Sequence, residues 1–155
     1  MPFSSLTNLL KTDLLETIKM VEMKGTYQRT SADNYEEFLS ALGLNMLLRK
    51  AATASTPVMT VSEEDGQWKI ETATMLKSIE LKFKLGQEFE ETTPDGRVVK
   101  AIVTKEGDKL ITVQTAKKEG EKSTKSVREF FDDKCVMTLE ITGTDVACTQ
   151  TFKRK

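Results

Sequence analysis

The sequence contains no histidine, and this absence excludes several kinds of chemistry. Catalytic triads that pair serine or cysteine with histidine, zinc sites with histidine ligands, and the usual proton shuttle near neutral pH all require that residue. Cysteine is also scarce: Cys135 and Cys148 occur without a CxxC motif. We therefore expect two reduced thiols that pack as small apolar groups, and no disulfide framework.

Two further absences limit the partners of the protein. Lys and Arg total 23 against 24 Asp and Glu, so the formal net charge is −1 and the basic surplus of a nucleic-acid-binding protein is missing. No apolar run approaches the roughly 18 residues of a membrane span, and the N-terminus lacks the apolar segment of a secretory signal. We expect a monomer in the cytoplasm, small enough to reach the nucleus, with no metal, no cofactor and no nucleic-acid partner.

Residues 1–19 differ in pattern from the rest of the chain, which divides the sequence into two segments. The apolar residues of this first segment recur at helical spacing, at Phe3, Leu6, Leu10, Leu14 and Ile18. The spacing predicts an amphipathic N-terminal extension. It either contacts a membrane surface or a partner, or packs on its own domain or frays. Residues 20–155 form the second segment, which we expect to be a single domain.

The second segment opens with one predicted strand and two predicted helices. GTYQRT, from residue 25, reads as a strand, and residues 33–42 read as a helix with Asp33 and Glu36 in the capping-box relation. Gly43 interrupts the helical pattern, and Pro57 ends the helical region. The apolar face of the second helix comprises Leu44, Leu47, Leu48 and Ala51.

The rest of the chain alternates between short strands and turns. Turn signals such as Asp65-Gly66, Pro94-Asp95-Gly96 and Gly143-Thr144 recur at even intervals, which gives roughly ten strands joined as a meander. A long meander removes its exposed edges by closing into a barrel. The sequence therefore predicts an all-β fold, a ten-stranded up-and-down antiparallel barrel with a helix-turn-helix lid between strands one and two.

Strand parity identifies the side chains that face the barrel interior, because alternate residues of a barrel strand point inward. Lys125 and Glu129 are expected to point outward, so the residues that alternate with them point inward. Lys134 and Glu140 give the same indication on the next strand. The inward residues predicted in this way are Thr124, Ser126, Arg128, Phe130, Cys135, Met137, Leu139 and Ile141. In residues 109–115, where parity is ambiguous, one face carries Leu110, Thr112 and Gln114, and on the last strand Gln150 and Phe152 lie opposite the wetter face of Thr151.

An interior arginine would constrain the ligand. Burying an unpaired guanidinium costs several kcal/mol by rough estimate, so Arg128 requires an anion, an acceptor network or water. Parity places no acid near it, which favours a ligand with an anionic head group. The alternative is a bulge that shifts the parity by one residue and places Arg128 on the surface.

Several stretches of residues 20–155 resemble the intracellular lipid-binding proteins, the family of the fatty-acid-binding and cellular retinoid-binding proteins. In order, the stretches are GTYQRTSADNYEEFLSALG, LLRK, FKLGQEFEETTPDGRVVK, KLITVQ, VREF and VACTQTFKR. The resemblance implies a flattened barrel of the calycin or lipocalin type with a large, partly water-filled cavity. It also implies a non-catalytic intracellular carrier of long-chain fatty acids.

The resemblance implies roles for individual residues. Arg128 in VREF matches the arginine that holds the carboxylate in fatty-acid binders, and Gln150 and water would assist it. The stretch Gln150-Thr151-Phe152 stands where many members have an Arg-x-Tyr pair, and it resembles the retinol-binding members. A carrier of retinoids or of another hydrophobic ligand is therefore the alternative. The binding-site residues that we expect in addition are Thr151, Phe152, Gln114, Thr112, Met137, Leu139, Thr74, Tyr35 and Leu39.

The resemblance also implies a portal beside the helical lid. Leu76 takes the place of a phenylalanine gate found in many members, and Arg49 and Lys50 match basic positions that contribute to membrane contact in some relatives. Transient membrane contact through the lid follows as an expectation. The portal residues are Leu44, Leu48, Leu76, Lys77 and Asp95.

Two other classes of protein compete with a carrier. An enzyme would have to use Arg128, Tyr27 or Tyr35 in the cavity, but the sequence shows no pair of nucleophile and base. A nucleic-acid-binding β-barrel would need a strand that combines aromatic and basic residues for base stacking, and the sequence has no such strand.

Overall fold

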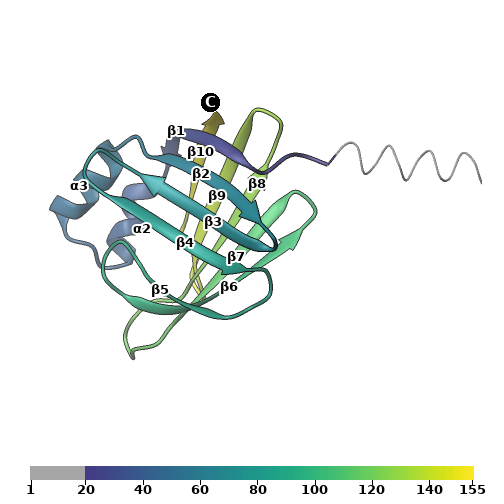
Figure 1. The fold of residues 1–155 in the computed structure, drawn as a ribbon. Coiled ribbons are helices and arrows are strands. Elements are labelled where there is room, and N and C mark those ends of the chain that lie inside the picture. The colour runs from purple at the N-terminus through teal and green to yellow at the C-terminus, as the bar shows by residue number, and fades with distance from the viewer. Residues whose placement is uncertain (1–19) are drawn as a thin grey trace, which may run out of the picture.

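The computed structural model describes residues 20–155, which form a β-barrel with two helices across one end (Figure 1). The helix predicted for residues 1–19 lies outside the described residues. The two helices, α2 (Tyr35–Ala41) and α3 (Met46–Ala54), follow the first strand, β1 (Gly25–Asp33). The remaining strands are β2 (Val58–Glu64), β3 (Gln67–Ala73), β4 (Ser78–Lys84), β5 (Phe89–Thr92), β6 (Val98–Glu106), β7 (Lys109–Ala116), β8 (Thr124–Phe130), β9 (Lys134–Ile141) and β10 (Ala147–Arg154).

All ten strands belong to one sheet, in the order β4-β3-β2-β1-β10-β9-β8-β7-β6-β5. Every pair of neighbours is antiparallel. All of these pairs join strands that follow one another in sequence, except the pair of β1 with β10. The predicted up-and-down barrel with its helical lid is therefore confirmed. Both helices are too short to cross a membrane, and no other helix occurs in residues 20–155.

The first and last strands lie side by side, and the side chain of Arg154 ties them together. It donates to the carbonyl oxygens of Lys24 and Glu22 and to the hydroxyl of Tyr27, and its guanidinium lies over the Tyr27 ring. Gly25, with φ of 148°, passes so close to this guanidinium that a Cβ at that position would clash with it. These contacts hold β1 against β10, the pair that joins the first and the last strand of the chain.

The helix α2 begins at Tyr35, so the predicted start at residue 33 and the predicted capping box are wrong. Asp33 is the last residue of β1 and is still registered opposite Thr149 of β10. Asn34 then turns the chain with a left-handed φ of 60°, while its side-chain amide donates to the carbonyl oxygen of Ala147 at 2.7 Å. The strand is longer than predicted because pairing with β10 overrides the local helical signal.

Apolar side chains gather in two clusters at different levels along the strands. The first cluster contains Tyr27, Phe130, Cys135 and Phe152, and the second lies under α2 and contains Phe38, Leu39, Ile141 and Cys148. The strand β9 runs from one cluster to the other, since Cys135 belongs to the first and Ile141 to the second. Between the two levels the inner faces of the strands become polar.

One side of the barrel is joined by side chains instead of backbone. β4 and β5 are the two ends of the strand order, and no ladder of hydrogen bonds links them within residues 20–155. The rings of Phe83 and Phe89 stack across this line with centroids 5.9 Å apart, and Trp68 stacks on Phe83 at 6.5 Å. Aromatic packing therefore covers the place where the sheet does not close.

Candidate functional site

Arg128, Met137 and Gln150 form one row across the inner faces of β8, β9 and β10. Arg128 is registered opposite Met137, and Met137 is registered opposite Gln150. Neighbouring strands lie about 4.8 Å apart, so the backbones of Arg128 and Gln150 are about 10 Å apart. Both long polar side chains thus leave the wall at the same level, between the two apolar clusters.

The next rows toward α2 continue this polar surface. Thr112 is registered opposite Ser126, and Gln114 is registered opposite Thr124. The hydroxyl of Thr124 donates to Oε1 of Gln114 at 2.8 Å. Parity left the direction of Thr112 and Gln114 open, and their pairing with the buried Ser126 and Thr124 places both on the inner face.

The guanidinium of Arg128 lies inside the protein without a complete set of partners. Its Nε is buried and donates to no acceptor within residues 20–155, and the buried Oγ1 of Thr112 has no hydrogen-bond partner there either. Burial lowers the pKa of Arg128, while the thiol of Cys135 and the carboxyl of Glu91 act in the opposite direction. The predicted inward direction of Arg128 is therefore correct, and no bulge shifts the parity of β8.

Arg128 and its neighbours on the inner faces keep some accessible surface. The Arg128 side chain is surrounded by protein, yet the residue keeps some accessible surface, as do Gln114 and Leu139 on the neighbouring inner faces. An enclosed side chain keeps such surface only where it borders a space that admits water. We infer that the inner faces of β7, β8 and β9 border an internal space.

A buried acid also faces this region, contrary to the prediction that no acid lies near Arg128. Glu91 on β5 is 9% exposed, and its Oε2 accepts a hydrogen bond of 2.7 Å from Nε2 of Gln114. Burial raises the pKa of Glu91, while the bond from Gln114 and the charge of Arg128 lower it. Within residues 20–155, Arg128 and Glu91 form no direct ion pair, so the cation inside the barrel is not neutralised by contact.

A second buried arginine, Arg29, was also missed. It lies on the inner face of β1 and is 7% exposed. Its Nη1 donates to Oε1 of Gln150 at 3.2 Å, and its Nη2 donates to the carbonyl oxygens of Ala52 at 3.0 Å and Ser55 at 2.7 Å. Parity gave a signal for this residue, since Arg29 stands two positions after Tyr27, which is completely buried.

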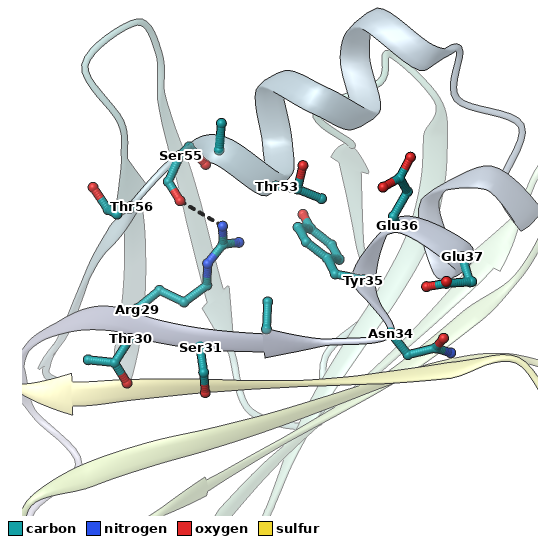
Figure 2. A pocket seen from close by; sticks show the side chains of 12 residues that line it. Arg29, Thr30, Ser31, Asn34, Tyr35, Glu36, Glu37, Thr53, Ser55 and Thr56 are labelled. Atoms are coloured by element: carbon teal, nitrogen blue, oxygen red, sulfur yellow. Dashed lines mark hydrogen bonds between the residues drawn. The ribbon is translucent and has the colours of Figure 1, made fainter.

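Arg29 also lines a pocket of about 460 Å³ between β1, α2 and α3 (Figure 2). Figure 2 shows its side chain rising from β1 toward Ser55, with the ring of Tyr35 beside the guanidinium. The guanidinium lies 5.2 Å from the centroid of that ring. Tyr35, predicted in the binding site, therefore contacts Arg29.

The remaining predicted site residues separate into two groups. Phe152 is buried in the first apolar cluster, Leu39 is buried in the second, and Leu139 packs against both. Thr151 is a correction, because it alternates with Gln150 and Phe152 and so lies on the outer face of β10. Its carbonyl oxygen there accepts a hydrogen bond from the hydroxyl of Thr30.

The predicted portal residues lie at the end of the barrel that carries the helices. Lys77 in the β3–β4 turn donates from Nζ to the carbonyl oxygen of Pro94 in the β5–β6 turn at 3.2 Å. Thr74 closes the first turn, where its hydroxyl bonds to the backbone of Lys77, so it does not lie among the inner rows. Asp95 belongs to the second turn and pairs with Arg97 at 2.8 Å.

The β3–β4 turn and the helix α3 carry apolar side chains, several of them exposed. Leu76 is 95% exposed at the tip of the β3–β4 turn, and Leu48 on α3 is 48% exposed, while Leu44 packs against the cluster under α2. Every residue of α3 keeps at least part of its surface exposed. The apolar face predicted for this helix thus lies largely in solvent.

Both cysteines are free and buried, as predicted. Burial raises the pKa of the Cys135 thiol to about 12 and that of the Cys148 thiol to about 11. Nearly all of either thiol stays protonated near neutral pH, so neither supplies a reactive thiolate.

Residues 24–155 match the model of the Lipocalin / cytosolic fatty-acid binding protein family. A "Fatty acid-binding protein" of Tyrophagus putrescentiae is 39% identical over 137 residues, which cover 88% of this chain and 100% of the relative. "Cellular retinoic acid-binding protein 2" of Mus musculus is 37% identical over 140 residues, with the same coverage of both chains.

Solved structures are similar over the same part of the chain. Apo lipid binding protein 8 of Caenorhabditis elegans has a TM-score of 0.82 at 28% identity, over 88% of this chain and 99% of that one. A Schistosoma mansoni fatty acid binding protein in complex with arachidonic acid has a TM-score of 0.78 at 28% identity, over 85% and 95%.

Proposed function

The chain belongs to the lipocalin and cytosolic fatty-acid binding protein family, and from that premise we propose that it is a non-catalytic carrier of long-chain fatty acids. The fatty acid occupies the barrel interior, and its carboxylate is held by Arg128 with Gln150 and water. The names of the relatives support a lipid as ligand, and the residues of the inner wall support an acid.

One observation carries the proposal. Arg128 is a buried cation without an ion-pair partner among residues 20–155, and it keeps an unpartnered Nε. The accessible surface that its residue retains supports our inference that it borders an internal space. A buried charge is costly unless it is paired, so this position favours an anion that enters with the ligand. The apolar clusters above and below the polar rows provide surfaces for a hydrocarbon tail.

The two parts of such a ligand contribute differently. Each buried methylene contributes about 0.8 kcal/mol, so ten methylenes contribute roughly 8 kcal/mol. Losses of about 4–15 kcal/mol on association offset much of that gain. A charge-assisted hydrogen bond to Arg128 adds about 1.5–3 kcal/mol. The tail therefore sets most of the affinity, and the head group sets the class of ligand.

A retinoid is the second candidate, and Gln150 is the residue that favours it. An amide both donates and accepts, so it serves a carboxylate, a hydroxyl or a bridging water. The relative named for retinoic acid is as completely covered as the one named for fatty acid. Retinoic acid would place its carboxylate at Arg128 in the same way as a fatty acid.

The turns beside α3 form the proposed portal. Leu76 and Leu48 expose apolar surface there, and Lys77 joins the two turns that border the opening. The same exposed surface supports transient contact with membranes during ligand transfer. A monomer in the cytoplasm, with access to the nucleus, completes the proposal.

The ligand of the purified protein tests this proposal directly. Native mass spectrometry of the full chain, followed by solvent extraction and identification of the bound molecule, should give a long-chain fatty acid. Addition of oleic acid to delipidated protein should restore the mass of the complex. Recovery of a retinoid would favour the second candidate. Failure of delipidated protein to bind oleic acid or retinoic acid would contradict a carrier of either kind.

A further inference from the structure

Arg29 contacts Gln150, a residue of the proposed ligand site, although the two residues lie on different strands. The two side chains are 121 positions apart in sequence, and both are buried, with exposures of 7% and 3%. Their hydrogen bond of 3.2 Å crosses from β1 to β10 at the level just below Gln150, where Arg29 is registered opposite Phe152. Gln150 is thus held from the side away from Arg128.

The chemistry of this bond fixes the direction of the Gln150 amide. A guanidinium has only donors, so the atom of Gln150 that faces Arg29 must be the carbonyl oxygen. The oxygen and nitrogen of a planar amide point in different directions, so the NH2 group is turned away from Arg29. On the side away from Arg29, Gln150 therefore presents the two donors of its NH2 group, while its oxygen is turned toward Arg29.

Arg29 is itself held in place by the lid, which keeps the amide in this direction. Its Nη2 is shared between the carbonyl oxygens of Ala52 and Ser55, at the end of α3, and its guanidinium lies against the ring of Tyr35 (Figure 2). A side chain with three hydrogen bonds and an aromatic ring beside it has little freedom to release Gln150. The wall opposite a ligand head group then offers donors from both Gln150 and Arg128.

We propose that Arg29 is a positioning residue that makes the head-group site selective for carboxylates over alcohols. This inference rests on the proposed function and names the class of ligand. A carboxylate only accepts hydrogen bonds, so it satisfies donors on both sides. An alcohol has one hydrogen to donate, and the Gln150 oxygen is turned toward Arg29 with one of its two lone pairs engaged, so it accepts less readily from a ligand on the Arg128 side. A retinol-like ligand is disfavoured for the same reason, although Gln150 alone would suit one.

The test compares oleic acid with oleyl alcohol, both measured by displacement of one fluorescent fatty-acid analogue. The quantity of interest is the ratio of the two affinities, because changes in folding or in the shape of the tail site cancel in it. Arg29→Met should release the amide of Gln150 and lower the acid-to-alcohol ratio about tenfold. Arg29→Lys retains a cationic donor beside Gln150 and should recover most of the ratio.

Two controls separate this role from a purely structural one. Asn45→Ala removes the side-chain cap of α3, where Asn45 Oδ1 accepts from the backbone of Leu48 at 2.9 Å, without touching Gln150. It should leave the ratio unchanged. In a Gln150→Leu background, adding Arg29→Met should change the ratio less than about twofold, because the amide that Arg29 positions is absent.

The same experiment has outcomes that overturn the inference. An unchanged ratio in Arg29→Met, or an equal fall with and without Gln150, would show that Arg29 does not act through the amide. A measurement on the wild-type chain covers the case in which Arg29→Met does not fold. In the wild-type chain, the NMR resonances of the Gln150 side-chain N–H groups should shift when oleic acid binds. If these resonances do not shift, the inference is also overturned. Failure of both ligands to bind the wild-type chain would instead remove the proposed function, and this inference with it.

Discussion

The Nζ of Lys77 donates to the carbonyl oxygen of Pro94 at 3.2 Å, which joins the β3–β4 turn to the β5–β6 turn. Leu76, the neighbour of Lys77, is 95% exposed beside this bond. The two turns lie at the end of the barrel where α2 and α3 also lie (Figure 1). In the proposed portal, a ligand that enters between the turns and the helices would pass Leu76.

Leu76→Trp should therefore slow ligand uptake and release together. A larger side chain at the opening raises the barrier in both directions but does not contact the bound ligand, so the equilibrium affinity should change little. Stopped-flow fluorescence with a fluorescent fatty acid measures both rates. Ile102→Trp, on the outer face of β6, is the matched control. Equal rates in Leu76→Trp and wild type would contradict a portal at this turn.

Arg128→Gln should weaken oleic acid more than oleyl alcohol, because only the acid loses a charged partner. The loss for the acid should be about 1.5–3 kcal/mol, or roughly 10–100-fold in affinity. Isothermal titration of both ligands measures the difference. Lys125→Gln removes a cation from the outer face of the same strand and should leave both affinities unchanged. If Arg128→Gln weakens the two ligands equally, Arg128 does not bind the carboxylate.

Glu91→Gln should stabilise the protein increasingly as the pH rises. Burial raises the pKa of Glu91, so the folded chain binds this proton more tightly than the unfolded chain does. The free energy of unfolding contributed by Glu91 therefore falls as the pH rises through its ordinary pKa toward the raised value. Glutamine does not ionise, and its carbonyl oxygen still accepts the hydrogen bond from Gln114.

Urea unfolding of wild type and Glu91→Gln across this pH window measures the effect. Glu140→Gln, an exposed glutamate on β9, is the reference for removing one carboxylate. The gain of Glu91→Gln over wild type should grow with pH by more than that of the reference. A difference between the two variants that does not depend on pH would contradict a destabilising charge at Glu91.

Residues 20–155 should bind fatty acids as tightly as the full chain. The family match covers residues 24–155, and the inner rows of the barrel belong to that part. Titration of both proteins with oleic acid should give affinities within about threefold of each other. A loss of about tenfold or more on removal of residues 1–19 would show that the extension contributes to the site.

The sequence was sufficient to predict most of the inner wall. Side chains alternate across a strand because of backbone geometry, so outward-facing Lys125 and Glu129 were enough to direct Arg128 inward. The same rule would have placed Arg29 inside, since it follows Tyr27 by two positions. It does not tell which other strand Arg29 contacts, because the hydrogen bond to Gln150 joins residues 121 positions apart.

Local signals failed where pairing between distant strands was stronger. Asp33 and Glu36 have the spacing of a capping box, yet Asp33 stays in β1 because β10 continues beside it. Glu91 was missed for a related reason. An acid in a short strand reads as exposed, and only the bond from Gln114 on a distant strand explains its burial.

Between β4 and β5 the barrel wall is held by an aromatic stack and not by a hydrogen-bonded ladder, so it can deform most easily there. Widening the wall there separates the rings of Phe83 and Phe89 but breaks no hydrogen bond of a sheet ladder. Gln150 lies on β10, near the middle of the strand order and far from both free edges. The wall can therefore widen by moving β4 and β5, while the strands that carry Arg128 and Gln150 keep their spacing. In the proposed carrier, such widening would admit a thicker or bent hydrocarbon tail.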